Sequence, residues 1–158
     1  MKSGKTSPEK RHKTGQFSRK KCLQELDGQD WGEAPDDASH LVCECHRLRR
    51  VPLKDLTVGN LRIMIGQDIG LEHLMPLTLE RLSLDPLAEG DFYGGDLLQK
   101  VLSVPPEFWA KNPDWADEVS TIAERAIALC ACSPEAADRT IPEVIRSAFA
   151  AFNRHRTH

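Results

Sequence analysis

Residues 52–104 read PLKDLTVGNLRIMIGQDIGLEHLMPLTLERLSLDPLAEGDFYGGDLLQKVLSV. This stretch predicts three amphipathic helical segments, because its large apolar residues recur at helical spacing between glycine and proline residues. Thr57 is suited to cap the first segment, and Gly66 is expected to end it. Pro76 lacks an amide proton, so we expect a kink or a new helix start there. The stretch contains no catalytic nucleophile motif, metal-ligand cluster or phosphate loop, which favours a scaffold that presents a surface.

An acidic loop over residues 85–96 separates the second and third segments. Asp85-Pro86 is expected to break the chain, because the residue before a proline avoids helical backbone angles. Asp96 is expected to cap a helix from Leu97 to Leu102. The two prolines at 105 and 106 end that helix and open a short turn with Phe108 and Trp109.

Upstream of this region, Ser39 is placed to cap a helix that extends to about Arg50. One face of this helix is apolar and is expected to be buried: Leu41, Val42, Cys45 and Leu48. Its later arginines are expected to face outward: Arg47, Arg49 and Arg50. Trp31 lies in a loop rich in glycine and proline, where an anchor on the domain's own core is more common than a partner contact.

Two longer helices are predicted downstream. Asp114 starts the first, and its apolar side chains recur at three- and four-residue steps: Trp115, Val119, Ile122, Ala126 and Leu129. Ser133-Pro134 closes it, Thr140 to Glu143 form a capping box for the last helix, and the tail 154–158 is expected to fray. No run alternates apolar and polar residues as a strand does. The predicted fold is therefore all-α, a single compact bundle of about six helices.

The length and composition fit one globular domain. The chain has 158 residues, of which 40% are hydrophobic and 28% charged. We assign the domain to residues 22–158, which are enough to bury a core without disulfides. No apolar run approaches the ~20 residues that span a bilayer, and no signal region follows the basic N-terminus. We therefore expect a cytoplasmic protein.

Charge is distributed unevenly along the chain. Residues 1–21 carry eight Lys/Arg against Glu9, a net charge of +7, which leaves −10 for the remainder of a chain with a total of −3. These residues have almost no aliphatic side chains and predict a flexible arm, which either binds nucleic acid or acidic surfaces or has no role. Acids concentrate in residues 22–37 and 84–118, the second with a net charge of −6. An acidic body of this kind repels nucleic acid and attracts basic partners.

The five cysteines are an odd number without a secretion signal, which predicts reduced thiols. Zinc is the alternative, because Cys43, Cys45-His46, Cys130 and Cys132 offer thiolate and imidazole ligands. Structural zinc sites space their cysteine pairs by two to four residues, whereas one residue separates each pair in this chain. Buried helix cysteines are therefore favoured, and no metal or cofactor is expected.

Catalytic signals are weak. The sequence has no Gly-x-Ser-x-Gly, His-Glu-x-x-His or phosphate-loop motif. Glu89, Asp91 and Asp96 are candidates for paired carboxylates in acid–base chemistry. Acids in a loop before a helix are more often solvated or capping. The chain is therefore predicted not to be an enzyme.

Phe92 and Tyr93 lie within the acidic loop. An aromatic anchor ringed by acids suits a basic protein partner, because the ring contributes affinity while the charges speed encounter. The alternative is that both rings hold the loop on the core. The residues alone leave both interpretations open.

Short motifs spread over residues 23–109 carry a resemblance. They are Leu26-Asp27-Gly28, Asp30-Trp31-Gly32-Glu33, Cys45-His46, Leu48-Arg49-Arg50, Leu56-Thr57, Leu61-Arg62, Ile65-Gly66-Gln67, Ile69-Gly70-Leu71, Pro76-Leu77, Leu79-Glu80, Glu89-Gly90-Asp91-Phe92-Tyr93 and Gly95-Asp96-Leu97-Leu98. In these motifs the chain resembles the CdiI immunity proteins of contact-dependent growth inhibition systems in Gram-negative bacteria. The family pattern has a proline where this chain has Gly94, a difference that loosens the loop.

The resemblance implies an antidote without turnover. Such a protein binds the C-terminal toxin domain of a CdiA-type surface adhesin and blocks it as a heterodimer. In many of these pairs the toxin is a nuclease, often one that attacks transfer RNA. The lack of a spanning segment and the acidic face agree with a basic nuclease partner.

We expect the toxin contacts among the loop acids, the two aromatic residues and two later acids: Asp85, Glu89, Asp91, Phe92, Tyr93, Asp96, Glu107 and Asp114. Residues shared by a family that meets different toxins also include scaffold positions, in which case the specificity contacts lie elsewhere. The alternative function is a small helical nucleic-acid-binding regulator that uses the basic arm. A third is an enzyme that uses Glu89 and Asp91.

Overall fold

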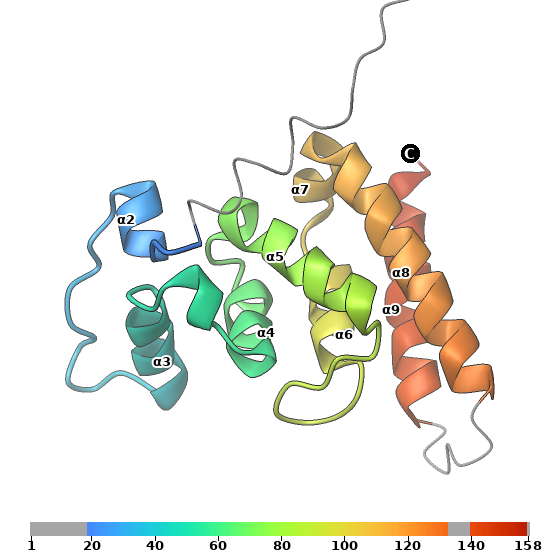
Figure 1. Cartoon of the computed structure of the whole chain (residues 1–158), viewed down its shortest axis with the longest axis horizontal. Coiled ribbons are helices and arrows are strands. Elements are labelled where there is room, and N and C mark those ends of the chain that lie inside the picture. The colour runs from blue at the N-terminus through green and yellow to red at the C-terminus, as the bar shows by residue number, and fades with distance from the viewer. Residues whose placement is uncertain (1–18, 133–139, 158) are drawn as a thin grey trace, which may run out of the picture. The chain divides into compact units, whose positions relative to one another are not determined.

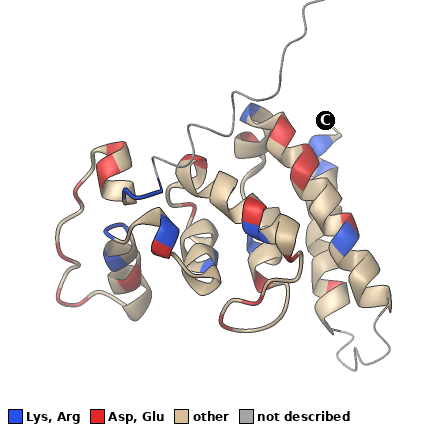
Figure 2. Ribbon diagram, viewed as in Figure 1, with Lys and Arg blue, Asp and Glu red and all other residues tan. Residues whose placement is uncertain are grey.

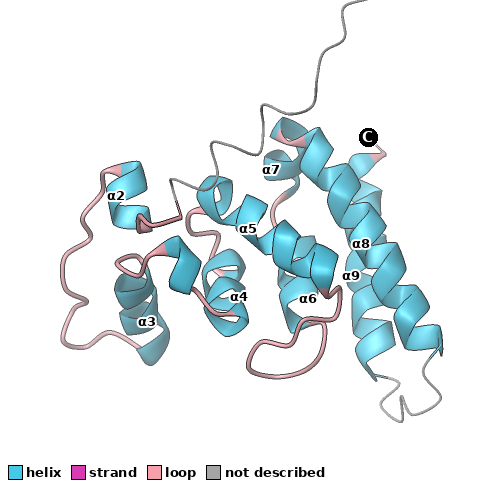
Figure 3. Cartoon of the chain, viewed as in Figure 1, coloured by secondary structure: helices cyan, strands magenta, loops and turns pink. Residues whose placement is uncertain are grey.

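The computed structural model of the protein describes residues 19–132 and 140–157. Within these residues every regular element is a helix, and no strand is formed (Figure 3). The prediction of an all-α fold is therefore confirmed. The described residues form eight α-helices, and the two beyond the predicted six are short: α2 (Leu23–Asp27) and α7 (Pro106–Lys111). None of the described helices is both long and apolar enough to pass through a bilayer.

The chain divides into two compact units, one up to Leu56 and one from Thr57 onward. The assignment of residues 22–158 to one domain stays a prediction. Most of the predicted arm, residues 1–18, lies outside the described residues. The described end of the arm is hydrogen-bonded, because the carbonyl of Arg19 accepts from the Lys54 amide at 2.9 Å and that of Lys21 from the Leu53 amide at 3.0 Å.

The first unit contains α2, α3 (His40–Leu48) and the 3-10 helix η2 (Leu53–Asp55) (Figure 1). The Ser39 hydroxyl accepts a hydrogen bond from the Val42 amide at 3.3 Å, which confirms the predicted cap. Cys45 and Leu48 are buried as predicted, whereas Leu41 and Val42 are exposed. An apolar pattern shows which face of a helix is apolar, but it does not show how many turns of that face are covered by neighbouring segments. In α3, burial begins at the second turn.

Arg49 is 3% exposed, so the prediction that it faces outward is wrong. Its guanidinium donates to both carboxylate oxygens of Asp27 at 2.8 Å and to the carbonyl of Gln29 at 2.9 Å. It also lies 4.3 Å from the ring centroid of Trp31, whose ring meets the His46 ring edge-on at 5.3 Å. The buried charge is tolerated because an ion pair and an aromatic ring replace its water. Trp31 contacts Arg49 and His46 of its own unit, but it is 41% exposed, so the prediction of a core anchor is only partly met.

The five cysteines are free thiols. Cys22 and Cys45 are buried, and burial raises the pKa of the Cys45 thiol. Cys43 and Cys132 are exposed, so the prediction of buried helix cysteines is wrong for these two. In the described part of the chain, no three His, Cys, Asp or Glu side chains gather in a way that could hold a metal ion.

The second unit contains α4 (Val58–Gly66), α5 (Leu71–Leu84), α6 (Asp96–Leu102), α7, α8 (Pro113–Cys132) and α9 (Thr140–Arg156). Thr57 caps α4 as predicted, since its hydroxyl accepts from the Asn60 amide at 3.1 Å while the Asn60 side chain accepts from the Thr57 amide at 3.0 Å. The helix ends at Gly66, also as predicted.

Helix α5 runs without interruption through Pro76, so the expected new start there is not observed. Proline removes one backbone hydrogen bond of the ladder. Its ring lies on the exposed side, while Leu74, Met75, Leu77 and Leu79 are buried around it. Burial of these side chains outweighs the loss of one bond near the start of the helix.

The core of this unit lies between two pairs of helices. Helix α4 packs against α6, and α8 packs against α9, which also contacts α6 (Figure 1). The buried side chains that these helices contribute include Leu61, Met64, Ile65, Leu97, Leu98, Val101, Val119, Ile122, Ile145 and Phe152. Trp109 of α7 meets Phe152 of α9 edge-on, with ring centroids 5.5 Å apart.

Two predictions about the last helices need correction. In α8 the buried face includes Ala116 and Ala123, whereas Leu129 is exposed and Trp115 only half-buried. Val119, Ile122 and Ala126 are buried as predicted. Helix α9 continues to Arg156, whose guanidinium donates to the Ser120 hydroxyl at 2.8 Å and pairs with Asp117, so this end is not frayed. The predicted stop at Ser133-Pro134 and the capping side chain of Thr140 lie outside the described residues.

Candidate functional site

The loop over residues 85–95 connects α5 to α6 and carries most of the predicted contact residues. The Asp85 side chain accepts from the Leu87 amide at 3.1 Å, which starts the turn after α5. Glu89 and Gly94 form an antiparallel bridge, and the Gly95 amide donates to the Leu87 carbonyl at 3.1 Å. The loop is therefore closed at its base by backbone contacts.

Asp96 holds the inside of this loop. Its carboxylate accepts from the Gly90 amide at 2.6 Å and from the Phe92 amide at 3.1 Å, and the residue is only 2% exposed. The helix starts one residue earlier than predicted, because Gly95 is the N-cap and Asp96 is already in the first turn of α6. The side chain therefore caps the loop amides rather than the amides of its own helix.

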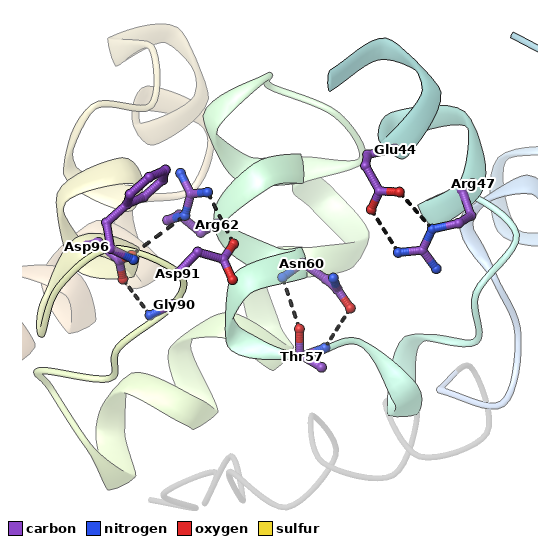
Figure 4. A network of polar contacts seen from close by, with 9 residues as sticks. Glu44, Arg47, Thr57, Asn60, Arg62, Gly90, Asp91 and Asp96 are labelled. Carbon is purple, nitrogen blue, oxygen red and sulfur yellow. Dashed lines mark hydrogen bonds and ion pairs between the residues drawn. The ribbon is translucent and has the colours of Figure 1, made fainter. Parts of the chain in front are cut away.

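Arg62 of α4 lies against the same loop (Figure 4). Its Nε is 3.6 Å from Asp96 Oδ2, an ion-pair distance, and its Nη2 donates to Asp91 Oδ2 at 3.3 Å. The guanidinium carbon is 4.4 Å from the centroid of the Phe92 ring. Because the Arg62 side chain is 13% exposed, one partly buried cation connects two carboxylates and an aromatic ring.

Two glycines allow this cluster to close. A Cβ at Gly59 of α4 would lie 2.7 Å from Asp91 Oδ1. At Gly90 it would lie 2.9 Å from Asp96 Oδ2 and 3.3 Å from Arg62 Cδ. Such distances are too short for a methyl group, so the absence of a side chain at both positions lets the carboxylates approach the backbone.

The two aromatic residues of the loop have different environments. Tyr93 is half-buried, and its hydroxyl donates to Gln99 Oε1 of α6. Phe92 is 69% exposed. Of the two alternatives drawn from the sequence, the loop-holding arrangement describes Tyr93, whereas Phe92 is presented to solvent.

We predict that Tyr93 ionises at a higher pH in the folded protein than in the unfolded chain. Burial raises its pKa and the charge of Asp96 raises it further, while Arg62 acts in the opposite direction. Because the unfolded chain loses this proton first, stability should fall as pH rises above about 10, and Tyr93→Phe should remove that loss. The chain has one tyrosine, so the ultraviolet absorbance of its phenolate reports this group alone. A native midpoint at or below that of the urea-unfolded chain would contradict the prediction.

The predicted acidic contacts do not form one continuous group. Asp85, Glu89 and Asp91 are exposed on the loop. Glu107 and Asp114 are exposed in the first turns of α7 and α8. These two turns lie at the end of this unit away from the loop (Figures 1 and 2). The structure thus brings together the acids before α6 and separates them from the two later ones.

The arrangement of the loop acids does not resemble an acid–base pair. Asp96 and Asp91 are both paired with Arg62, and Glu89 is exposed.

An open hollow of about 480 Å³ lies beside Gln99, the hydrogen-bond partner of Tyr93. The rest of its lining is Ser103, Glu143, Val144, Ser147 and Ala148. Glu143 is the one carboxylate in that lining.

Arg62 is the site residue that sequence reasoning missed. Its partners Asp91 and Asp96 lie about thirty residues further along the chain, and no local pattern connects them. One signal was available, because Arg62 is the only charged residue within α4. A single charge in an otherwise uncharged helix suggests a specific partner.

A family model described as CDI immunity proteins matches residues 25–119, which include α3 to α7, the whole loop and the Arg62 cluster. No curated protein matches the chain. Since the family model covers more than half of its length, the chain belongs to the family of CDI immunity proteins.

Proposed function

We propose that this protein acts in the cytoplasm, where it binds the C-terminal toxin domain of a CdiA-type adhesin one-to-one and blocks a basic nuclease. The observation that carries the proposal is that the segment 84–118, with its net charge of −6, lies inside the matched region. A nuclease needs a basic surface to bind phosphates, and an acidic surface can occupy it or its approaches. Transfer RNA is the first substrate class to test.

The loop acids are the proposed contacts, together with Phe92. Asp85, Glu89 and Asp91 are exposed on one short loop whose backbone is closed at its base. Asp96 and Tyr93 support this surface from within, because both are engaged in hydrogen bonds of the loop and α6. Glu107 and Asp114 lie elsewhere in the unit and contribute to long-range attraction rather than to contact.

The first experiment titrates the toxin domain encoded beside this chain with the purified protein. Cleavage of transfer RNA should fall linearly and end at an equimolar ratio, and co-expression should restore growth of cells that produce the toxin. Loss of toxin activity well below an equimolar ratio would indicate an enzyme instead. The proposal would be contradicted if the protein failed to protect these cells or failed to bind the toxin domain.

The second experiment asks which acids meet the toxin. Glu89→Lys and Glu107→Lys change the net charge equally, but they lie on the loop and on α7 respectively. Glu89→Lys should slow association about fivefold at low salt and weaken its dependence on salt. Glu107→Lys should slow association less than twofold. Equal effects of the two variants would show that overall charge, and not the loop, determines binding.

A further inference from the structure

Phe92 combines exposure with a fixed position. Scattered exposed apolar side chains are normal on protein surfaces, so exposure alone carries no conclusion. Leu84, at the end of α5, is 83% exposed and is an example of such a side chain. Phe92 differs because the guanidinium of Arg62 lies 4.4 Å from its ring centroid.

The support behind this ring is itself held in place. Arg62 is an α4 residue, and its guanidinium contacts Asp96 at 3.6 Å and Asp91 at 3.3 Å. The Phe92 amide donates to the same Asp96 carboxylate at 3.1 Å. The backbone of Phe92 is thus bound to the buried carboxylate of Asp96 directly. Its ring is connected to the same carboxylate through Arg62.

Such an arrangement lowers the cost of binding. A side chain that is already immobilised loses little conformational freedom when a partner covers it. Aromatic residues with few rotatable bonds are the common anchors of interfaces, and surrounding charges select the partner. Around Phe92 the exposed charges of the loop are the carboxylates of Asp85, Glu89 and Asp91.

We propose that Phe92 is the anchor of the toxin-binding surface and that Arg62 is its positioning residue. This inference rests on the proposed function. The complementary site on the toxin domain is an apolar socket bordered by Lys or Arg side chains, because the ring enters it with acids on its rim. Arg62 acts by holding the Phe92 ring in place, and it does not itself contact the toxin.

The test is a double-mutant cycle on binding to the purified toxin domain, with Leu84→Ala as the matched control. Phe92→Ala should raise the dissociation constant about 30-fold, mainly through faster dissociation. Arg62→Met should raise it about tenfold. The double variant should bind about as weakly as Phe92→Ala alone, because Arg62 acts through the ring. Leu84→Ala should change binding less than threefold.

The cycle separates positioning from general damage to the fold. Damage caused by Arg62→Met would weaken binding equally with and without the Phe92 ring, so additive effects would overturn the role of Arg62. Hydrogen exchange of the Gly90 and Phe92 amides in the free protein gives a second readout. Both amides should exchange faster in Arg62→Met and remain unchanged in Leu84→Ala.

The possible failures are distinguishable. If the wild-type protein does not bind the toxin domain, the proposed function fails, and this inference fails with it. If the wild type binds and Phe92→Ala binds equally well, only the anchor is wrong. A change in the oligomeric state of the free protein on Phe92→Ala would show that a second copy of the chain is the occupant, which would also overturn the proposal.

Discussion

Asp96→Ala is expected to lower the free energy of unfolding of the second unit by about 3 kcal/mol. The carboxylate accepts hydrogen bonds from the amides of Gly90 and Phe92, and its Oδ2 lies 3.6 Å from Arg62 Nε. Its removal leaves two loop amides without their acceptor and a largely buried guanidinium without one of its counter-ions. It also removes a negative charge from the first turn of α6, where the helix dipole favours it.

Two further variants define the origin of this effect. Asp96→Asn keeps one oxygen for a loop amide but loses the charge, so it should cost about half as much as alanine. Glu89→Ala removes an exposed acid from the same loop and should change stability by less than about 0.5 kcal/mol. Urea denaturation followed by tryptophan fluorescence measures all three. Equal stabilities of Asp96→Ala and Glu89→Ala would show that the buried carboxylate does not hold the loop.

Gly95→Ala is expected to destabilise the protein by about 3 kcal/mol, for two separable reasons. The backbone at Gly95 has φ +94°, in the region that residues with a Cβ rarely adopt. A Cβ there would also lie 2.8 Å from Ile145 Cδ1 and 3.4 Å from Leu87 Cδ2. The first reason is backbone strain, and the second is overpacking between the loop base and α9.

The two contributions can be measured apart. Gly28→Ala is a control for strain, because Gly28 has φ +69° with nothing within 4 Å of its added Cβ, and it should cost about 1 kcal/mol. Ile145→Val removes the atom that the new methyl group would strike. The double variant Gly95→Ala/Ile145→Val should therefore lose about 1 kcal/mol less free energy of unfolding than the two single variants lose together. Strict additivity would exclude the predicted contact with Ile145.

Local rules predicted the helices well. Ser39 and Thr57 cap the helices expected of them, and Gly66 ends α4, because each of these effects depends on residues within one turn of the helix. The same rules overestimated Pro76, since they count the lost hydrogen bond but not the buried side chains around it.

Contacts between distant segments were beyond these rules. Arg49 was expected to face outward because it lies off the apolar face of its helix, but its partner Asp27 lies 22 residues away. Asp96 was expected to cap its own helix, whereas folding places the loop amides within its reach. Arg62 was missed for the same reason. The exposure of Phe92 follows from the course of the loop, and no local pattern distinguishes it from its neighbour Tyr93.

The loop before α6 is closed by backbone contacts and by Asp96, which lies outside its tip. The shape of the loop therefore does not depend on which side chains its tip carries. The Glu89–Gly94 bridge and the amides bound by Asp96 need no particular side chain at positions 89 and 92. Both positions can therefore vary while the chain keeps its fold. Because the proposed toxin-binding surface includes both positions, a combinatorial library at these two codons would test which side chains set the affinity while the loop keeps its shape.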